Sequence, residues 1–214
     1  MLKHKQIVSI NILSIIIILL IPASIFAMDR PPEGPTAIVV DDETGKPIEG
    51  AVALAIWRGY KDDCTFVQGI EGGCWGFKKA EEALSDKEGR VEIKDFWRTT
   101  KGPGKWGSAY DPRLTVYKFG YVCWDQKEIF EPNYKWTKRT DFDKTHRIVR
   151  LKKWSEGFSF REHASFEDGV TNGDATLSTA PLFTKAFRTE GPAIAEELER
   201  YYQELEKKRS IKKN

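Results

Sequence analysis

The sequence has few of the side chains on which catalytic metal sites and nucleic-acid surfaces depend. Its 214 residues include only three histidines and three cysteines. After the first 27 residues the histidines are His146 and His163, and neither belongs to a His-x-x-Glu pair. Two such imidazoles are too few for a catalytic zinc site of the usual kind. The 34 basic residues are nearly balanced by 32 acidic ones, so the chain lacks the broad positive field that binds nucleic acid.

The placement of the few cysteines predicts one local disulfide. Cys64 and Cys74 flank a glycine-rich segment, and a bridge between them would close a short loop. Cys123 lies in an apolar run and is expected to be a small buried hydrophobe, with pairing to either of the others left open. The three cysteines lack the paired spacing of a zinc site. A disulfide agrees with an oxidising compartment.

The first 27 residues have the pattern of a secretory signal peptide. Lys3 and Lys5 precede an apolar run over 7–21, which Pro22 interrupts. We expect cleavage after the small residue Ala27. The alternative is an uncleaved membrane anchor, because the run approaches spanning length. Cleavage would leave equal numbers of basic and acidic residues, and the protein is expected to be periplasmic or secreted, touching a membrane only if the segment is uncleaved.

From residue 36 to about 154 the chain alternates short apolar segments with polar turns. Strands are predicted at 36–41 and 48–57, with a turn around Gly45 and Pro47, and we expect the two strands to pair as a hairpin. Further strands are predicted at 79–85, 90–94, 114–117, 122–130 and 146–151. Seven short strands without a long helix between them predict a mainly β fold, an antiparallel sandwich.

Beyond Trp154 the pattern changes. Residues 155–190 are low in β-branched residues and carry turn signals at 168–169 and 172–174, so we expect an irregular wrap with a helical turn at most. From Pro192 apolar residues recur at helical spacing, with acids early and bases late. This predicts an amphipathic helix with a basic tail over 191–214, docked beside the sandwich. The alternative for its apolar stripe is a partner helix or a membrane surface.

Three motifs carry a family resemblance: VVDDETGKPIEGAVALAIW over 39–57, ALSDKEGRVEI over 83–93 and DPRLTVYKFGYV over 111–122. They resemble the carboxypeptidase regulatory-like domain, a seven-stranded transthyretin-like (prealbumin-like) sandwich. The likeness covers about residues 34–152 and implies one such domain over 34–154, after a linker at 28–33. The chain is also similar to small exported bacterial proteins in which this domain stands nearly alone. Strand and turn motifs imply a fold and not an activity, and nothing matches the zinc-containing catalytic domain of metallocarboxypeptidases.

Two further groups of residues could carry chemistry. The acidic turns at 41–43 and 86–88 would form a cation site if they met, since hard cations bind several oxygens. Turn aspartates more often accept hydrogen bonds from their own backbone, and we favour that interpretation. Ser85 with His146 offers a nucleophile and a base, but no nucleophile elbow accompanies them. The sequence therefore predicts no catalytic residue, metal site or cofactor.

Tryptophan is the abundant residue of interest, with seven copies. Trp57 and Trp124 lie in predicted strands and are expected in the core. Four aromatic residues in or beside loops are candidate ligand-binding residues: Trp75, Trp106, Tyr134 and Trp136. Exposed indoles stack on sugar rings and anchor protein interfaces. The alternative is that the loops pack their own aromatics into a satellite core.

These observations together predict a protein that binds a partner and is not an enzyme. The loops at 61–78, 95–112 and 131–143 are the predicted recognition surface, since sandwiches hold their end loops rigidly. They interleave the aromatics with basic residues, among them Lys135, Lys138 and Arg139. We expect an exported, non-catalytic binding or interaction module of the cell envelope, whose partner is an envelope protein or a glycan and not nucleic acid. The alternative is a carbohydrate-binding module that uses the loop tryptophans.

Overall fold

The computed structural model describes residues 34–60, 75–94, 96–97, 112–132 and 135–211. The predicted signal peptide and linker, both cysteines of the predicted disulfide, Trp106 and Tyr134 lie outside these residues. The described strands are β1 (Ala37–Asp41), β2 (Val52–Tyr60), β3 (Trp75–Leu84), β4 (Arg90–Val91), β5 (Arg113–Tyr117), β6 (Trp124–Asp125), β7 (Glu128–Glu131), β8 (Lys135–Lys138) and β9 (Ile148–Leu151). The described helices are α2 (Phe160–Thr171), α3 (Pro181–Phe187), the 3₁₀ turn η2 (Arg188–Glu190) and α4 (Gly191–Ile211).

The strands form several small sheets. One has the order β4-β1-β9 and a larger one the order β3-β2-β5-β6, while β7 and β8 pair only with each other. All pairs in the larger sheet are antiparallel, and so is β1 with β4. The pair β1 and β9 is parallel, with Val39 opposite Val149. The prediction of a purely antiparallel arrangement is therefore wrong at this pair.

The hairpin predicted over 36–57 is also wrong, because β1 and β2 lie in different sheets. The predicted turn does form, with Gly45 at a φ of 67°. After it only a short segment returns along β1: Val40 bridges to Pro47, and the Ile48 N–H donates to the Val39 carbonyl at 3.0 Å. The chain then crosses to the larger sheet. Residues 48–51 share the apolar pattern of β2 because Ile48 and Ala51 belong to the same core cluster as β1.

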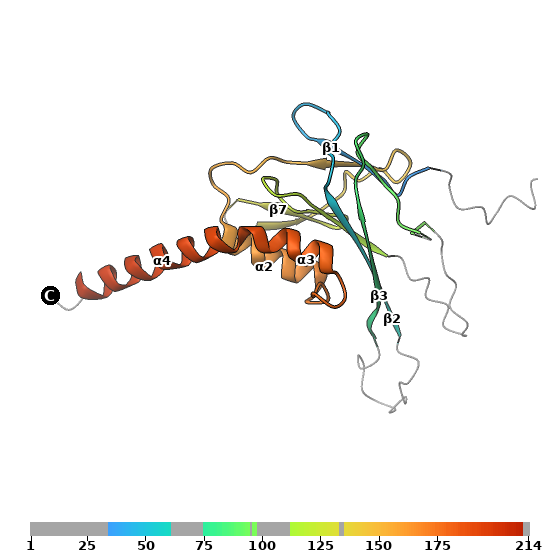
Figure 1. The fold of residues 1–214 in the computed structure, drawn as a ribbon. Coiled ribbons are helices and arrows are strands. Elements are labelled where there is room, and N and C mark those ends of the chain that lie inside the picture. The colour runs from blue at the N-terminus through green and yellow to red at the C-terminus, as the bar shows by residue number, and fades with distance from the viewer. Residues whose placement is uncertain (1–33, 61–74, 95, 98–111, 133–134, 212–214) are drawn as a thin grey trace, which may run out of the picture. The chain divides into compact units, whose positions relative to one another are not determined.

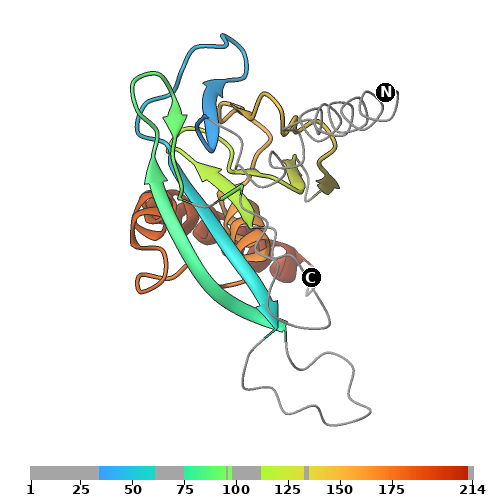
Figure 2. The same cartoon turned by 90° about the vertical axis from the view of Figure 1, so that its right-hand side faces the viewer.

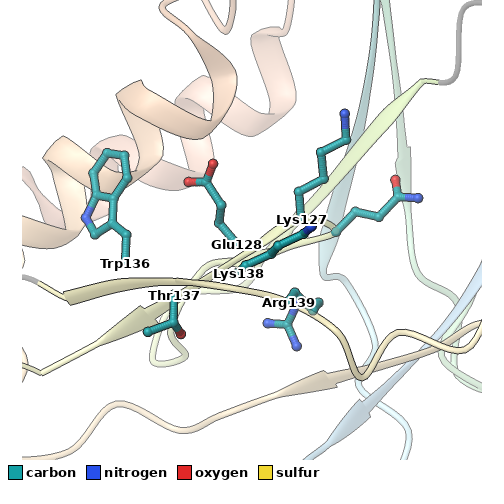
Figure 3. Close-up of a pocket in the computed structure, with 7 residues that line it drawn as sticks. Lys127, Glu128, Trp136, Thr137, Lys138 and Arg139 are labelled. Carbon is teal, nitrogen blue, oxygen red and sulfur yellow. The ribbon is translucent and has the colours of Figure 1, made fainter.

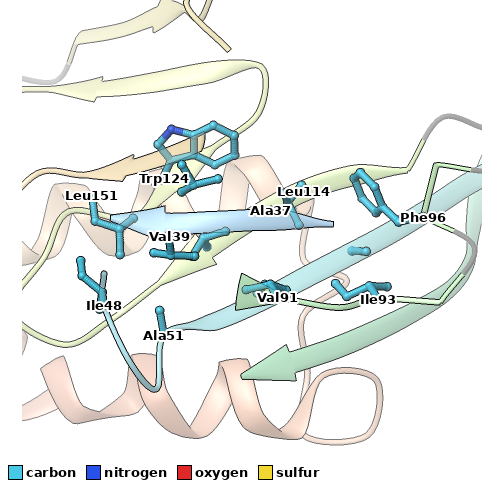
Figure 4. Packing of buried hydrophobic residues seen from close by; sticks show 14 of the residues in the cluster. Ala37, Val39, Ile48, Ala51, Val91, Ile93, Phe96, Leu114, Trp124 and Leu151 are labelled. Carbon is cyan, nitrogen blue, oxygen red and sulfur yellow. The ribbon is translucent and has the colours of Figure 1, made fainter. Parts of the chain in front are cut away.

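An aliphatic core lies between the two larger sheets, and Figure 4 shows its side chains converging. Val39 of β1, Val91 of β4 and Val149 of β9 come from one sheet, while Ala53 of β2 and Leu114 of β5 come from the other. All five are fully buried. Trp57 and Trp124 belong to the same cluster, which confirms their predicted core positions. We call this group the inter-sheet cluster.

A second core lies on the opposite face of the larger sheet. Val52, Leu54 and Ile56 of β2 face this side and pack with Phe166 of α2 and Phe183 of α3. Strand β2 is thus apolar on both faces, which explains its unbroken apolar run VALAIW. Figure 2 shows the long strands β2 and β3 in front of the helices, so the larger sheet is the middle layer of three. We call this group the helix-side cluster.

The irregular wrap predicted over 155–190 is wrong, because α2 and α3 occupy much of it (Figure 1). The Ser159 hydroxyl caps α2 by accepting from the Glu162 N–H at 3.2 Å. The turn signals around 172 are the end of this helix, with Asn172 in the left-handed conformation. The predicted C-terminal helix is confirmed as α4. In the described part of the chain, no helix combines the length and apolarity needed to cross a membrane.

Candidate functional site

The candidate site is on the hairpin of β7 and β8, part of which was predicted to be a loop. Its register places Glu128 opposite Lys138, Phe130 opposite Trp136 and Glu131 opposite Lys135. A cross-strand aromatic pair of this kind stabilises a hairpin. Phe130 is buried and packs on Phe166 of α2, with ring centroids 5.3 Å apart. All four residues of β8 are exposed.

Helix α2 holds the indole of Trp136 in place. The Trp136 ring meets Phe166 edge to face at 5.3 Å. Its six-membered ring also lies directly against Gly169, where any Cβ atom would clash with it. The side chain nevertheless remains 45% exposed. One part of the indole is therefore fixed against the helix while the rest is open to a ligand.

A pocket of about 720 Å³ opens beside this indole. Its lining consists of polar and charged residues around one aromatic ring: Gln126, Lys127, Glu128, Trp136, Thr137, Lys138 and Arg139. In Figure 3 Trp136, Glu128 and Lys127 point to the same side of the hairpin, and Thr137 points to the other. The pocket volume is in the range typical of small-molecule sites.

Asp125 fixes the bend from which the pocket residues project. Its carboxylate is fully buried and accepts from Nε and Nη2 of Arg113, both at 2.7 Å. It also accepts from the N–H groups of Lys127 and Glu128 at 2.8 and 2.9 Å. The single strand predicted over 122–130 is therefore wrong: it bends after Asp125 into β6 and β7, and β7 leaves the larger sheet.

Some charged side chains around the pocket already have a protein partner, and others are free to bind a ligand. Lys127 and Lys138 are exposed, and neither forms an ion pair with a described residue. Glu128 lies 3.5 Å from Arg113 through Oε1, while its Oε2 is buried without a hydrogen-bond partner in the described structure. The pocket therefore presents two available ammonium groups beside one carboxylate.

Arg139 was predicted to belong to the charged rim of the recognition surface. Its guanidinium instead bonds other residues of the protein and is not available to a ligand. Its side chain is only 10% exposed and pairs with Asp141 at 3.0 Å. Its Nε donates to the Asp125 carbonyl at 2.6 Å, and its guanidinium lies 4.7 Å above the Trp124 ring. Burial lowers the pKa of Arg139. This residue supports the base of the pocket.

Of the four predicted ligand-binding aromatics, the structure places only Trp136 in a site. Trp106 and Tyr134 lie outside the described residues, and Trp75 is described only as the first residue of β3. Trp97, also in a predicted recognition loop, packs against the inter-sheet cluster and meets Phe96 edge to face at 4.9 Å. For this one tryptophan the satellite-core alternative is confirmed.

A buried polar group that sequence reasoning missed lies within the helix-side cluster. The Cys123 N–H donates to Nε2 of His163 at 2.8 Å, so the ring proton is on Nδ1 and bonds Glu190 at 2.9 Å. The Tyr117 hydroxyl donates to the other oxygen of Glu190 at 2.8 Å. Burial raises the pKa of the Cys123 thiol. Because the Nε2 lone pair is occupied and the thiol is kept neutral, this group is suited to joining the helices to the sheet and not to nucleophilic attack.

The other predicted candidates have local partners. The Asp41 carboxylate accepts from the N–H of Thr44 at 2.8 Å, and Asp86 accepts from the Arg90 N–H at 2.7 Å. The favoured interpretation of these aspartates as turn residues is confirmed.

The Ser85 hydroxyl donates to the Ile48 carbonyl at 2.6 Å, and His146 bonds Asp143. Ser85 and His146 are therefore engaged with different partners. Among the described residues no group of three or more acidic, histidine or cysteine side chains converges as a metal site.

We compared the chain with known protein families, curated proteins and solved structures. No protein-family model matches the chain, and searches of curated proteins and of solved structures give no match.

Proposed function

We propose that this protein is an exported, non-catalytic binding module of the cell envelope, built on a transthyretin-like sandwich. The strand arrangement supports the fold: the sheets β4-β1-β9 and β3-β2-β5-β6 contain seven strands and share the inter-sheet cluster. The hairpin β7–β8 and the helices are additions to those seven strands. The fold supports binding only as a scaffold, and the site must carry the function.

The observation that carries the proposal is the Trp136 indole. It is fixed on one side by Phe166 and Gly169, and it is 45% exposed beside a pocket. A rigid aromatic ring binds at little cost in conformational entropy, and tryptophan is enriched among residues that dominate binding energy. Truncating such an anchor typically weakens binding by about 2 kcal/mol or more.

A carbohydrate-binding module is the second candidate, and the polar lining of the pocket favours it. Glu128 and Gln126 supply hydrogen-bonding groups to the lining of the pocket that contains this one aromatic ring. Sugars bind to such an arrangement through stacking on the ring and hydrogen bonds at its edge. A protein partner would use the same indole as an interface anchor.

Capture from an envelope extract tests the proposal. Immobilised wild type should retain a partner that Trp136→Ala does not retain. Tyr202→Ala is the matched control, because Tyr202 is another exposed aromatic residue, on α4 and outside the pocket. Thermal unfolding should show that all three proteins are folded. Equal recovery of every bound component by the three proteins would refute a recognition role for this hairpin.

A further inference from the structure

We infer that the pocket beside Trp136 binds an acidic saccharide, with the indole stacked on a sugar ring and the lysines on its anionic group. This inference rests on the proposed binding function and names the ligand class of the same site. Three features of the pocket carry it: its one aromatic ring, its charges and its unpaired acceptor.

The ring comes first. On the described hairpin Trp136 is the only large apolar side chain that is exposed. A single flat ring with polar neighbours suits the C–H face of one sugar unit, whereas a protein interface has a core of several apolar side chains. The pocket volume of about 720 Å³ has room for a small ligand.

The charges select an anion. Lys127 and Lys138 both line the pocket and are exposed, and neither pairs with a described carboxylate. Arg139 is held by Asp141 and Asp125, so the two lysines are the cations available to a ligand. A carboxylate or sulfate on the sugar would meet two ammonium groups at the wall of the pocket.

The acceptor favours a polyhydroxylated ligand over a simple anion. Oε2 of Glu128 is buried without a hydrogen-bond partner among the described residues, and an unpaired buried acceptor is costly. In Figure 3 the Glu128 side chain stands between Trp136 and Lys127. A sugar hydroxyl can donate to this carboxylate, whereas a sulfate dianion has no proton to donate.

Calorimetric titration with matched saccharides tests the inference. The probes are three pairs: trigalacturonate and its methyl ester, sialyllactose and lactose, and a sulfated carrageenan tetrasaccharide with its desulfated, neutral form. For at least one pair we expect the anionic member to bind wild type about tenfold more tightly than its neutral counterpart, since two exposed ion pairs of about threefold each are involved. Trp136→Ala should weaken that binding by about 30-fold. No preference for the anionic member in any pair would overturn the inference.

A matched pair of lysine variants separates the pocket from general charge. Lys138→Gln should weaken binding of the anionic member about threefold. Lys135→Gln makes the same charge change on the same exposed strand but outside the pocket, and should leave affinity unchanged. Equal weakening by both variants would overturn the inference. If no saccharide binds but the extract yields a Trp136-dependent protein partner, the saccharide inference fails while the proposed binding function stands. If neither saccharide binding nor capture of a partner depends on Trp136, the saccharide inference and the proposed binding function both fail.

Discussion

The inter-sheet cluster and the helix-side cluster cover opposite faces of the same sheet with different side chains. Strand β2 contributes Ala53 and Ala55 to the first cluster, and Leu54 and Ile56 to the second. The first is mostly aliphatic. The second contains a set of packed aromatic rings: Tyr117, Phe130, Phe166, Phe183 and Phe187. Along the first part of β2 the residues are small toward the facing sheet and larger toward the helices, whose rings fill the space beside the sheet. At the far end of β2 this reverses, because Trp57 fills the inter-sheet side and meets Phe96 edge to face.

The two clusters also differ in the kind of buried polar group that they contain and in the partners of these groups. Beside the inter-sheet cluster the Ser85 and Thr36 hydroxyls bond backbone groups, such as the Ala51 N–H at 2.8 Å. The helix-side cluster instead contains His163 and Glu190, both buried to 1% exposure or less. Buried hydrogen-bonding groups are costly to leave unpaired when a partner is lost. We expect the helix-side cluster to depend far more on its polar group.

The largest expected effect on stability comes from truncating the protein after Trp154. This truncation removes all the described helices. Truncation would expose Leu54, Ile56 and Tyr117 on the middle sheet, and losing one ring such as Phe166 alone costs about 3–5 kcal/mol. Total stability of a domain is about 5–15 kcal/mol. We therefore expect the 28–154 fragment to show no cooperative transition in calorimetry and to aggregate. A soluble fragment with one sharp transition would show that the inter-sheet cluster is sufficient, as the domain boundary predicted at 154 implies.

The same contrast explains how much of the fold was predictable. Apolar residues alternate with polar ones at Val91 and Ile93 and again at Leu114 and Val116. This local pattern alone predicts the strands that contribute to the inter-sheet cluster. The parallel pairing of β1 with β9 was not predictable, because it joins residues about a hundred positions apart. Helix α2 was missed although Ser159 and Glu162 have the spacing of a capping box, which is a local signal. Only the additional contact of its first turn with Glu197 of α4 is distant in sequence.

The candidate site was predictable only in part. The richness in loop aromatics pointed to Trp136, but nothing local indicates that Gly169 of α2 makes room for its indole. Arg139 looks like a rim residue in sequence, and it became a buried support because Asp125 and Trp124 lie beneath it. The His163–Glu190 pair gave no signal, because the two residues are 27 positions apart in a segment without a recognised core pattern.

The next largest effect compares Glu190→Ala with Ser85→Ala. Removing Glu190 leaves the Nδ1 proton of His163 and the Tyr117 hydroxyl unpaired and opens a cavity where the buried side chain was, so unfolding free energy should fall by about 3–5 kcal/mol. Removing the Ser85 hydroxyl leaves one backbone N–H and one carbonyl unpaired, and should cost about 1–3 kcal/mol. Urea unfolding measures both. The exposed Glu204→Ala on α4 is the control and should change little. Equal losses in the two variants would contradict the proposed difference between the clusters.

The smallest expected effect is a change in the pH dependence of stability, caused by Glu167 on α2. Burial, followed by the nearby charges of Asp168 and Glu190, raises the pKa of this carboxyl from 4.5 to about 7. Between these values the folded protein holds a proton that the unfolded chain has lost. The folded state therefore binds more protons there, and its stability falls as pH rises from about 4.5 to 7. Asp143 acts in the opposite sense, but only at lower pH, because the His146 hydrogen bond lowers its pKa to about 2.

Glu167→Gln keeps the neutral form at every pH. Its unfolding free energy in urea, measured at pH 5, 6, 7 and 8, should therefore fall less with pH than that of wild type, and above pH 7 the variant should be the more stable protein. Glu196→Gln is the matched control, because that side chain is 72% exposed on α4 and should leave the wild-type slope unchanged. Identical slopes for Glu167→Gln and wild type would mean that Glu167 is solvated in the folded protein. The helix-side cluster would then reach less far along α2 than its packing indicates.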